Sequence, residues 1–352
     1  MSSMRSAAEP TTATEWVASL SPWPEEFGLE RMRQLIARLG DPQDLYPAIH
    51  VVGTNGKSTA TRTIAELLRA EGLRVGAYTS PHVSGWHERL NCDPATFERA
   101  VARVRSVAAE LGATQFEVLT AAALREFADE QVDVAVVEAG LGGRLDATNV
   151  VDAEVVLLTN VALEHTEVLG DTHEEIAREK LAVAHAARVV VMSDNTHENL
   201  VPKEAEPLLG GAREAAEAFL GRRIEHELTA FLPGRLEHRD GEVWDGAHTP
   251  EAADWLLDRL LARNNVLCVS ILGDKRVDEL LERLSKAGRT LVATRSTNPR
   301  ALPEDELASR AKRHFEHVET VADPHEALAR AREVGGPVLV TGSLYLLADL
   351  YS

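Results

Sequence analysis

The sequence predicts an α/β fold in which a doubly wound, mostly parallel sheet is followed by a second, smaller Rossmann-like domain. Short apolar runs of strand length alternate with amphipathic helical patterns along most of the chain, a rhythm typical of parallel sheets covered by helices. One strand-to-helix connection, at residues 53–59, carries the glycines and the lysine of a phosphate-binding loop. The alternation resumes after a polar, alanine-rich segment at residues 193–229, which indicates the second domain.

Composition limits the partners. Hydrophobic residues make up 44% and charged residues 26% of the 352 residues, and this length allows two domains with substantial cores. The net charge of −19 opposes binding to nucleic acid or to an anionic membrane, although a local nest of N–H groups can still bind ATP. Two cysteines, Cys92 and Cys268, argue against a disulfide framework and favour a reducing compartment.

The first residues carry no recognisable targeting signal. Residues 1–18 lack the basic start and apolar centre of a signal peptide, and no apolar run reaches membrane-spanning length. We therefore expect a cytoplasmic protein. Because residues 2–14 are rich in Ser, Thr and Ala, we expect a disordered tail, which we extend to residue 20.

The phosphate-binding loop follows an apolar run at residues 48–52 and precedes a helical pattern through Ile64 and Leu67. In this setting backbone N–H groups converge on an anion at a positive helix N-terminus, and a lysine reaches the terminal phosphates. Only two residues separate the glycines, where the usual pattern has four, so a turn with a buried lysine is the alternative. The strand-to-helix context favours a nucleotide. Gly53 and Gly56 would let the backbone approach the anion, Lys57 would reach the terminal phosphates, and Ser58 or Thr59 would offer a hydroxyl towards Mg²⁺.

The remaining elements follow in order. A helix with Met32, Leu35 and Ile36 on one face ends at Gly40-Asp41-Pro42. The periodicity predicts strands at 73–78, 132–137, 153–158 and 188–192, helices at 94–111, 116–130, 172–187 and 212–220, and a functional loop at 79–92. We place an ATP-binding domain at residues 21–229 and the C-terminal domain at 230–352. The latter begins with a hairpin at Asp240-Gly241 and has strands near 266–271, 290–293, 317–321 and 337–341.

Polar residues at the carboxyl ends of strands are the candidate site, because ligands of doubly wound sheets bind there. Glu138 ends an apolar strand, where it is either a Mg²⁺ ligand or half of a structural salt bridge. His165 is either a ligand or a hydrogen-bonded core histidine. Ser80 alone would be a turn serine, and Lys180 alone a solvated helix lysine.

Two further segments contain charged residues near glycine or proline. In the glycine-rich stretch 140–149, Arg144 and Asp146 either contact a charged substrate or pair with each other. In the second half, Asp245 and His248 lie at a strand-to-helix turn. Capping of that helix explains Thr249 and the following proline, but it requires neither Asp245 nor His248.

Together these blocks resemble one family, folylpolyglutamate synthase/dihydrofolate synthase, within the Mur ligase superfamily of ATP-dependent amide-forming ligases. The resemblance runs over nearly the whole chain. Its specific blocks are Gly53–Thr59, Thr79–His82, Glu138–Asn149 with Leu163–Thr166, Arg178–Lys180, Leu232–Arg235 and Asp245–Pro250. It implies a Mur-ligase-like fold, with an N-terminal phosphate-loop ATPase domain and a C-terminal glutamate-ligase domain.

The resemblance also implies roles for individual residues. The ATP phosphates would be held by Gly53, Thr54, Asn55, Gly56, Lys57, Ser58 and Thr59. The family's metal-binding positions, where two Mg²⁺ ions are expected, match Ser80, Glu138 and His165. Lys180 matches the lysine that is carbamylated in this family. The family's positions that reach towards the nucleotide and the incoming amino acid match Arg235, Asp245 and His248. Ser343 matches a position that lines the glutamate side of the site. The loop expected near the pterin contains His82, Glu88 and Arg89.

The activity implied is the addition of L-glutamate to the carboxylate of dihydropteroate or tetrahydrofolate through an acyl phosphate, by a monomeric enzyme. This chain departs from the family pattern at Ser58-Thr59, at Thr249, and in shortened segments after Ser80 and Lys180. The alternatives are therefore another ligase of the superfamily that joins a different acid, and a nucleotide-binding regulatory protein without catalysis. Residues 142–149 favour the folate branch over the former, and Lys57, Glu138, His165 and Lys180 favour an enzyme over the latter.

Overall fold

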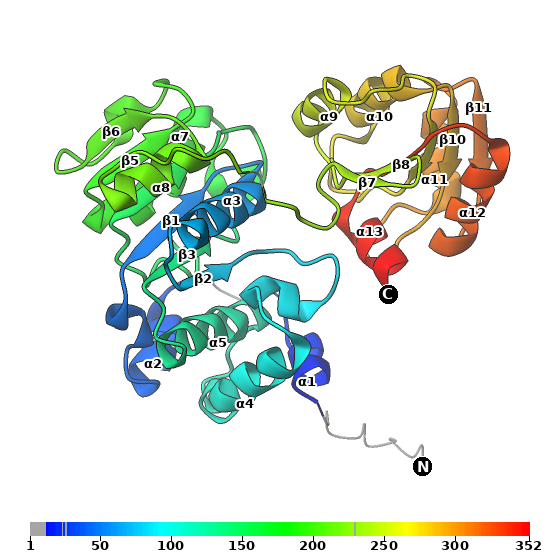
Figure 1. Ribbon diagram of the computed structural model, residues 1–352. Helices are drawn as coiled ribbons and strands as arrows, with labels where there is room; N and C mark the ends of the chain where they lie inside the picture. The colour runs from blue at the N-terminus through cyan, green and yellow to red at the C-terminus, as the bar shows by residue number, and fades with distance from the viewer. Residues whose placement is uncertain (1–11, 23, 25–26, 229) are drawn as a thin grey trace, which may run out of the picture. The chain divides into compact units, whose positions relative to one another are not determined.

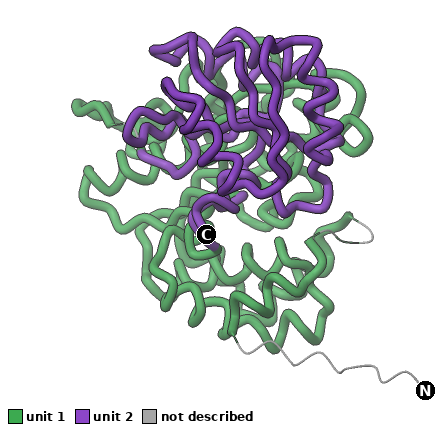
Figure 2. The backbone as a smooth tube through the Cα atoms, turned by 90° about the vertical axis from the view of Figure 1, so that its right-hand side faces the viewer, with its two compact units in different colours: residues 1–80, 86–230 green, residues 81–85, 231–352 purple. Residues whose placement is uncertain are grey.

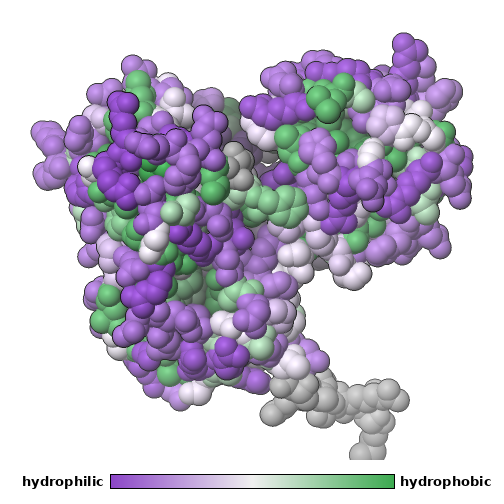
Figure 3. Space-filling view, in the orientation of Figure 1, coloured by the Kyte–Doolittle hydropathy of each residue, from purple (hydrophilic) through white to green (hydrophobic). Residues whose placement is uncertain are grey.

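A computed structural model describes residues 12–22, 24, 27–228 and 230–352. The chain divides into two compact units, of which unit 1 contains residues up to 80 together with 86–230, and unit 2 contains residues 81–85 and 231–352 (Figure 2). The predicted domain boundary placed residues 81–85 in the first domain, whereas the structure packs them in the second. The face of the molecule in Figure 3 is largely hydrophilic, with smaller apolar patches between the charged side chains.

Unit 1 is built on a six-stranded, entirely parallel sheet with the strand order β2-β3-β1-β4-β5-β6 (Figure 1). This doubly wound sheet was predicted, apart from its last strand. The strands are β1 (Ala48–Val52), β2 (Val75–Tyr78), β3 (Val134–Glu138), β4 (Val155–Leu158), β5 (Val189–Met192) and β6 (Glu206–Leu209). Strands β1 to β5 are buried throughout, which explains their continuous apolar runs.

Helices cover both faces of this sheet. The first face packs against α3 (Lys57–Ala70) and α8 (Ala212–Leu220), through side chains such as Ile64 and Leu68. The opposite face packs against α5 (Gln115–Asp129), which is covered in turn by α4 (Pro94–Glu110). The unit also contains the helices α2 (Glu30–Arg38), α6 (Thr166–Leu169) and α7 (His173–Leu181), and the 3-10 turns η1 (Pro42–Leu45), η2 (Trp86–Leu90), η3 (Ala182–Ala186) and η4 (Glu198–Leu200).

Part of the predicted N-terminal tail is a helix. Residues 1–11 lie outside the described residues, but α1 spans Ala13–Ser19 and begins with a capping box between Thr12 and Glu15. Trp16 and Val17 are buried in the core of unit 1, and Glu98 of α4 accepts hydrogen bonds from the N–H groups of Ala13 and Thr14. The prediction of disorder was therefore wrong from residue 13 onwards, because two apolar side chains and a distant carboxylate stabilise a polar sequence.

Strand β6 was also missed. All four of its residues are exposed at the sheet edge, and Pro207 is among them. An edge strand needs neither alternation nor an apolar run, and it tolerates proline. Its sequence therefore gave no strand signal, whereas the neighbouring helix α8 begins and ends as predicted.

Unit 2 is a second six-stranded sheet, with the order β11-β10-β9-β12-β8-β7. All neighbours are parallel except β7 and β8, which form the predicted hairpin. Asp240 and Gly241 both have positive φ at its turn, as this tight connection requires. The strands are β7 (Glu237–Arg239), β8 (Glu242–Trp244), β9 (Val266–Val269), β10 (Thr290–Ala293), β11 (His317–Thr320) and β12 (Val338–Thr341).

The two faces of this sheet have separate cores. One is formed with α9 (Pro250–Leu257), α10 (Val277–Leu284) and α11 (Glu304–Ala311). The other is formed with α12 (Pro324–Val334) and α13 (Leu344–Tyr351), and it includes Val83 from the short segment 81–85. The 3-10 turn η5 (Ser285–Ala287) follows α10. No helix among the described residues is long and apolar enough to span a bilayer.

Candidate active site

The phosphate-binding loop lies between β1 and α3, as predicted. Gly56 is the residue before α3 and has a φ of 79°, a left-handed conformation that glycine adopts without strain. The N–H groups of Lys57, Ser58 and Thr59 form the first turn of α3, where no helical carbonyl can accept them. The N-terminus of α3 therefore offers donors and a positive dipole to an anion.

The loop is held in place by residues that follow β4, the neighbour of β1. Asn160 accepts hydrogen bonds from Thr54 N (3.0 Å, to its carbonyl) and from Asn55 N (2.9 Å, to Oδ1), and Thr159 Oγ1 donates to Asn55 O at 2.7 Å. A Cβ on Gly53, whose φ is 146°, would lie 1.9 Å from Thr159 Oγ1. Neither Thr159 nor Asn160 was among the predicted site residues, although their position at a strand end next to β1 was a usable signal.

Two lysines converge on the first residue of the loop. Lys57 Nζ donates to the carbonyls of Gly53 and Thr54, both at 3.1 Å, and Lys180 Nζ of α7 donates to the same Gly53 carbonyl at 2.8 Å. Lys180 is 4% exposed, so it is not the solvated helix lysine of the alternative interpretation. Burial first, and the Lys57 charge second, lower the pKa of Lys180 to about 7, so much of its amine is neutral near pH 7.

Glu138 lies beside this loop, because its strand β3 pairs with β1 and places Glu138 opposite Val51. The carboxylate is 1% exposed and accepts hydrogen bonds from Ser58 Oγ (3.0 Å) and from the backbone N–H of Ser80 (2.9 Å). Ser58 Oγ also lies 3.3 Å from Ser80 O. These oxygens, with the Ser80 hydroxyl, are the hard donors that Mg²⁺ prefers, so the residues fit a divalent cation at this position.

His165 is the third predicted metal ligand. It has a φ of 53° and precedes the short helix α6. Its ring nitrogens lie 3.8 Å from Glu164 Oε1 and 3.7 Å from Glu167 Oε1. Within the described ranges, no three His, Cys, Asp or Glu side chains gather as a metal cluster. The role of His165 as a ligand stays a prediction.

The glycine-rich stretch after β3 has a buried acid at its centre. Asp146 accepts hydrogen bonds from Leu141 N, from Thr148 N and from Thr148 Oγ1, at 2.7, 3.0 and 2.5 Å. Arg144 pairs instead with Glu179 of α7, with 2.8 Å between Nε and Oε2. The alternative in which Arg144 and Asp146 pair with each other is therefore wrong, and their contacts to substrate stay predictions.

The loop predicted to lie near the pterin is divided between the units. Arg89 is in η2 of unit 1, where its guanidinium lies 5.5 Å from the centre of the Trp86 ring and its carbonyl accepts Thr79 N. His82 is in the segment 81–85 of unit 2. The roles of both residues stay predictions.

The predicted residues of unit 2 surround the turn between β8 and α9. Asp245 accepts Leu236 N at 2.7 Å and Ala247 N at 2.8 Å, and His248 Nδ1 lies 2.8 Å from Gly246 O. Burial raises the pKa of Asp245, while Arg235 and His248 oppose the rise. Ser343 is 2% exposed and caps α13 by accepting Tyr345 N, which is a sufficient structural reason for a serine there.

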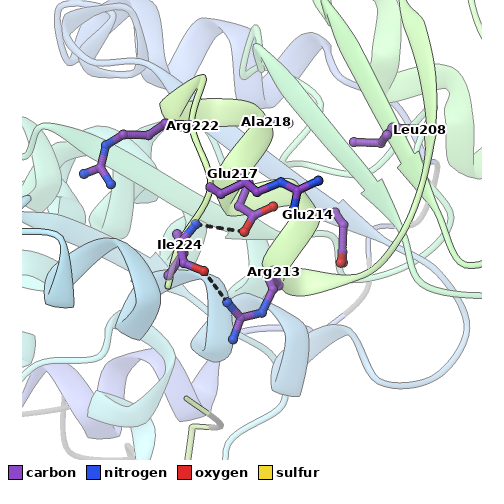
Figure 4. A pocket seen from close by; sticks show the side chains of 8 residues that line it. Leu208, Arg213, Glu214, Glu217, Ala218, Arg222 and Ile224 are labelled. Carbon is purple, nitrogen blue, oxygen red and sulfur yellow. Dashed lines mark hydrogen bonds between the residues drawn. The ribbon is translucent and has the colours of Figure 1, made fainter. Parts of the chain in front are cut away.

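A hollow in the surface of unit 1 is lined by none of these residues. It has a volume of about 680 Å³ and lies at α8 and the segment that follows it (Figure 4). Its charged side chains serve the local fold, since Arg213 donates to Ile224 O and Glu217 accepts Ile224 N. We therefore place the candidate active site at the phosphate loop.

Comparisons with known families match both units. Residues 51–208 match the Mur ligase middle domain, and residues 234–344 match the Mur ligase, glutamate ligase domain. The dihydrofolate synthase/folylpolyglutamate synthase of Escherichia coli is 30% identical, covering 92% of this chain and 90% of that protein. The folylpolyglutamate synthase of Lacticaseibacillus casei is 32% identical, covering 90% and 92%. The probable bifunctional folylpolyglutamate synthase/dihydropteroate synthase of Haloferax volcanii is 33% identical over 92% of this chain, but the chain spans only 48% of that protein.

Solved structures agree. The folylpolyglutamate synthase of Mycobacterium tuberculosis complexed with ADP superimposes with a TM-score of 0.86 at 28% identity, covering 94% of this chain and 96% of that one. The Escherichia coli FolC structure in complex with DHPP and ADP gives a TM-score of 0.85 at 27% identity, covering 97% of both chains. A bifunctional folylpolyglutamate synthase/dihydrofolate synthase with Mn, AMPPNP and L-glutamate bound gives 0.84 at 28% identity, again covering 97% of both.

A phosphate loop on a parallel sheet, an acid beside it and a glutamate ligase domain together define an ATP-dependent ligase of the Mur type, which uses a divalent metal. Within this class, the extent and level of the similarity decide the family. The chain belongs to the folylpolyglutamate synthase/dihydrofolate synthase family.

Proposed function

We propose that this protein joins L-glutamate to the carboxylate of a pteroate or a reduced folate, at the cost of ATP. The observation that supports this most strongly is the assembly of Lys57, Glu138 and Lys180 around one phosphate loop, in a chain that spans nine-tenths of a dihydrofolate synthase/folylpolyglutamate synthase. Either half of that observation would be weaker alone, since a phosphate loop serves many reactions and a relative can lose its activity.

In the first step, the substrate carboxylate attacks the γ-phosphorus of ATP, the bond to the ADP oxygen breaks, and an acyl phosphate forms. The N–H groups of the first turn of α3 and the ammonium of Lys57 face the phosphates and neutralise charge that develops on the transferred group. To do so, Lys57 exchanges the carbonyls of Gly53 and Thr54 for phosphate oxygens. A divalent cation held by Ser80 and Glu138 would polarise the phosphoryl oxygens.

In the second step, the amine of L-glutamate attacks the acyl carbon, and inorganic phosphate leaves as the amide forms. We assign Arg235, Asp245, His248 and Ser343 of unit 2 to the nucleotide and the amino acid, following the family pattern. His165 is proposed as the further metal ligand, and a carbamylated Lys180 as an anion that supports the cations. We also propose that the enzyme acts as a monomer in the cytoplasm.

Phosphate release from ATP tests the proposal. The purified protein is incubated with Mg²⁺ and ATP, with and without L-glutamate, and with dihydropteroate or tetrahydrofolate as the acceptor. We expect release only when glutamate and one acceptor are both present, with a product heavier by one glutamate residue. Release that needs glutamate but neither acceptor would identify a different ligase, and ATP binding without any release would identify a non-catalytic relative. The dihydropteroate synthase activity in the name of the Haloferax volcanii relative forms no part of the proposal.

A further inference from the structure

Three buried polar side chains form a line that the proposed chemistry does not use. His50 lies in the middle of β1 and is 0% exposed, and its Nε2 lies 2.8 Å from Thr148 Oγ1. The hydroxyl of Thr148, also 0% exposed, donates to Asp146 Oδ1 at 2.5 Å. Burying an imidazole in the core of a parallel sheet costs free energy unless it is hydrogen-bonded. The hydrogen bonds through Thr148 to Asp146 therefore offset part of the cost of burying His50.

The neighbours of Asp146 determine where the protons lie. Both carboxylate oxygens already face donors, since Oδ2 accepts Leu141 N and Oδ1 accepts Thr148 N. Since both oxygens act as acceptors, the Thr148 hydroxyl is the donor to Asp146. The Thr148 oxygen then accepts a hydrogen bond from His50 Nε2. His50 is then the neutral Nε2–H tautomer. Its other nitrogen, Nδ1, is buried and has no hydrogen-bond partner among the described residues.

The line reaches the active site through the loop it holds. Asp146 organises residues 141–148, and this loop packs against the end of α7, where a Cβ on Gly143 would lie 2.5 Å from Lys180 O. Arg144 N also donates to Glu179 O at 3.0 Å. Lys180 in turn donates to the carbonyl of Gly53, three residues after His50. A closed ring of contacts thus leads from β1 through the loop and α7 back to the phosphate loop.

We propose that His50 is a positioning residue for ATP, which donates from Nε2 to Thr148 and thereby sets the place of the 141–148 loop and of Lys180. The proposal rests on the proposed function only in taking ATP as the ligand of the phosphate loop. A line that served the fold alone would affect unfolding and leave nucleotide binding unchanged. The two roles can therefore be separated by experiment.

Thr148→Val keeps the shape of the side chain and removes the hydroxyl, whereas Thr148→Ser keeps the hydroxyl. We expect Thr148→Val to weaken Mg²⁺–ADP binding, measured by calorimetry, and to lower kcat/KM for ATP, each by about tenfold. Thr148→Ser should restore both to within about twofold. Thr294→Val is the matched control, because Thr294 is a fully buried threonine of unit 2 whose hydroxyl donates to Ala322 O at 3.0 Å. It should reduce thermal stability without changing either nucleotide measurement.

The tautomer provides a test that needs no variant. In a long-range ¹H–¹⁵N spectrum of the wild-type protein, His50 should carry its proton on Nε2 and leave Nδ1 unprotonated. A proton on Nδ1 would overturn the proposal, and so would a folded Thr148→Val protein with wild-type ADP affinity. If the wild type releases no phosphate with either acceptor, the proposed function fails, while ADP binding and the spectrum still decide the role of His50.

Discussion

Lys57 and Lys180 donate hydrogen bonds to the same oxygen, the carbonyl of Gly53, at 3.1 and 2.8 Å. Burial lowers the pKa of Lys180, and repulsion from the neighbouring Lys57 ammonium lowers it further, to about 7. A neutral amine is a nucleophile, whereas Lys57 remains in contact with the loop that would receive phosphate. The two lysines of the site therefore differ. Lys57 is suited to bind phosphate, and the neutral amine of Lys180 is suited to covalent modification.

The first prediction concerns Lys57. Lys57→Ala should lower kcat by about 10²–10³-fold, because one positioned donor to the transferred phosphoryl group is lost. The exposed Lys203 supplies the control, and Lys203→Ala should keep wild-type kcat. Circular dichroism of both variants checks the fold. Near-normal turnover by Lys57→Ala would refute the role of Lys57 at the phosphates.

Lys180→Ala should be nearly inactive, and short carboxylates such as acetate should partly restore its activity. The reason is that the small anion can enter the space of the lost side chain and supply the negative charge that a carbamate would carry. The assay compares acetate with chloride at equal ionic strength. Equal response to the two salts would contradict the carbamate role, and Lys57→Ala should respond to neither.

Stability should also depend on pH through Lys180. Its pKa is about 7 in the folded state and 10.5 for an ordinary lysine, so between these limits the unfolded chain binds more protons, and stability rises with pH. Relative to that of Lys180→Met, the free energy of unfolding of the wild type should rise on the order of 3–5 kcal/mol from pH 7 to 10.5. Below pH 7 the difference between the two proteins should stay constant. Denaturant unfolding in CO₂-depleted buffer measures this. A constant difference across the window would show that Lys180 keeps an ordinary pKa.

Glu138→Gln should raise the Mg²⁺ or Mn²⁺ concentration for half-maximal activity by about tenfold or more. The amide keeps the size of the side chain, but it removes the charge that favours a cation beside Ser58 and Ser80. Glu126→Gln is a suitable control, because Glu126 is 4% exposed and pairs with Arg103 away from the phosphate loop. A metal requirement unchanged in Glu138→Gln would exclude Glu138 as a ligand.

The last prediction concerns the stability of unit 2. The Arg239 guanidinium lies between two rings, 4.0 Å from the centre of Trp244 and 4.2 Å from that of Tyr351, and the rings meet edge to face at 5.7 Å. Tyr351→Ala should therefore cost about 2 kcal/mol of unfolding free energy. Tyr351→Phe keeps the ring and loses only the hydrogen bonds of the hydroxyl to Glu237 and Arg239, so it should cost less than half as much. Urea unfolding followed by tryptophan fluorescence compares the two, and equal losses would rule out the ring contacts as the cause.

Much of the fold could be predicted because its signals are local. Strands buried on both faces have continuous apolar runs, the hairpin has Asp240-Gly241, and Thr249 with Pro250 marks the start of α9. The phosphate loop is equally local, since its glycines and Lys57 are adjacent in the chain. Among the elements that were missed, α1 is stabilised by distant contacts and β6 by an edge position, and both leave little trace in their own residues.

By itself, the sequence determined the α/β rhythm, the phosphate loop and the candidates at the strand ends, because each depends on residues a few positions apart. Only the tertiary structure decided that Asn160 holds Asn55, that Arg144 pairs with Glu179 rather than Asp146, and that His50 reaches Thr148. It also decided that Lys180 is buried and donates a hydrogen bond to the carbonyl of Gly53, 127 residues earlier in the chain. These partners come together only when the strands pair in register, and a pKa responds to that packed surrounding rather than to neighbours in the chain.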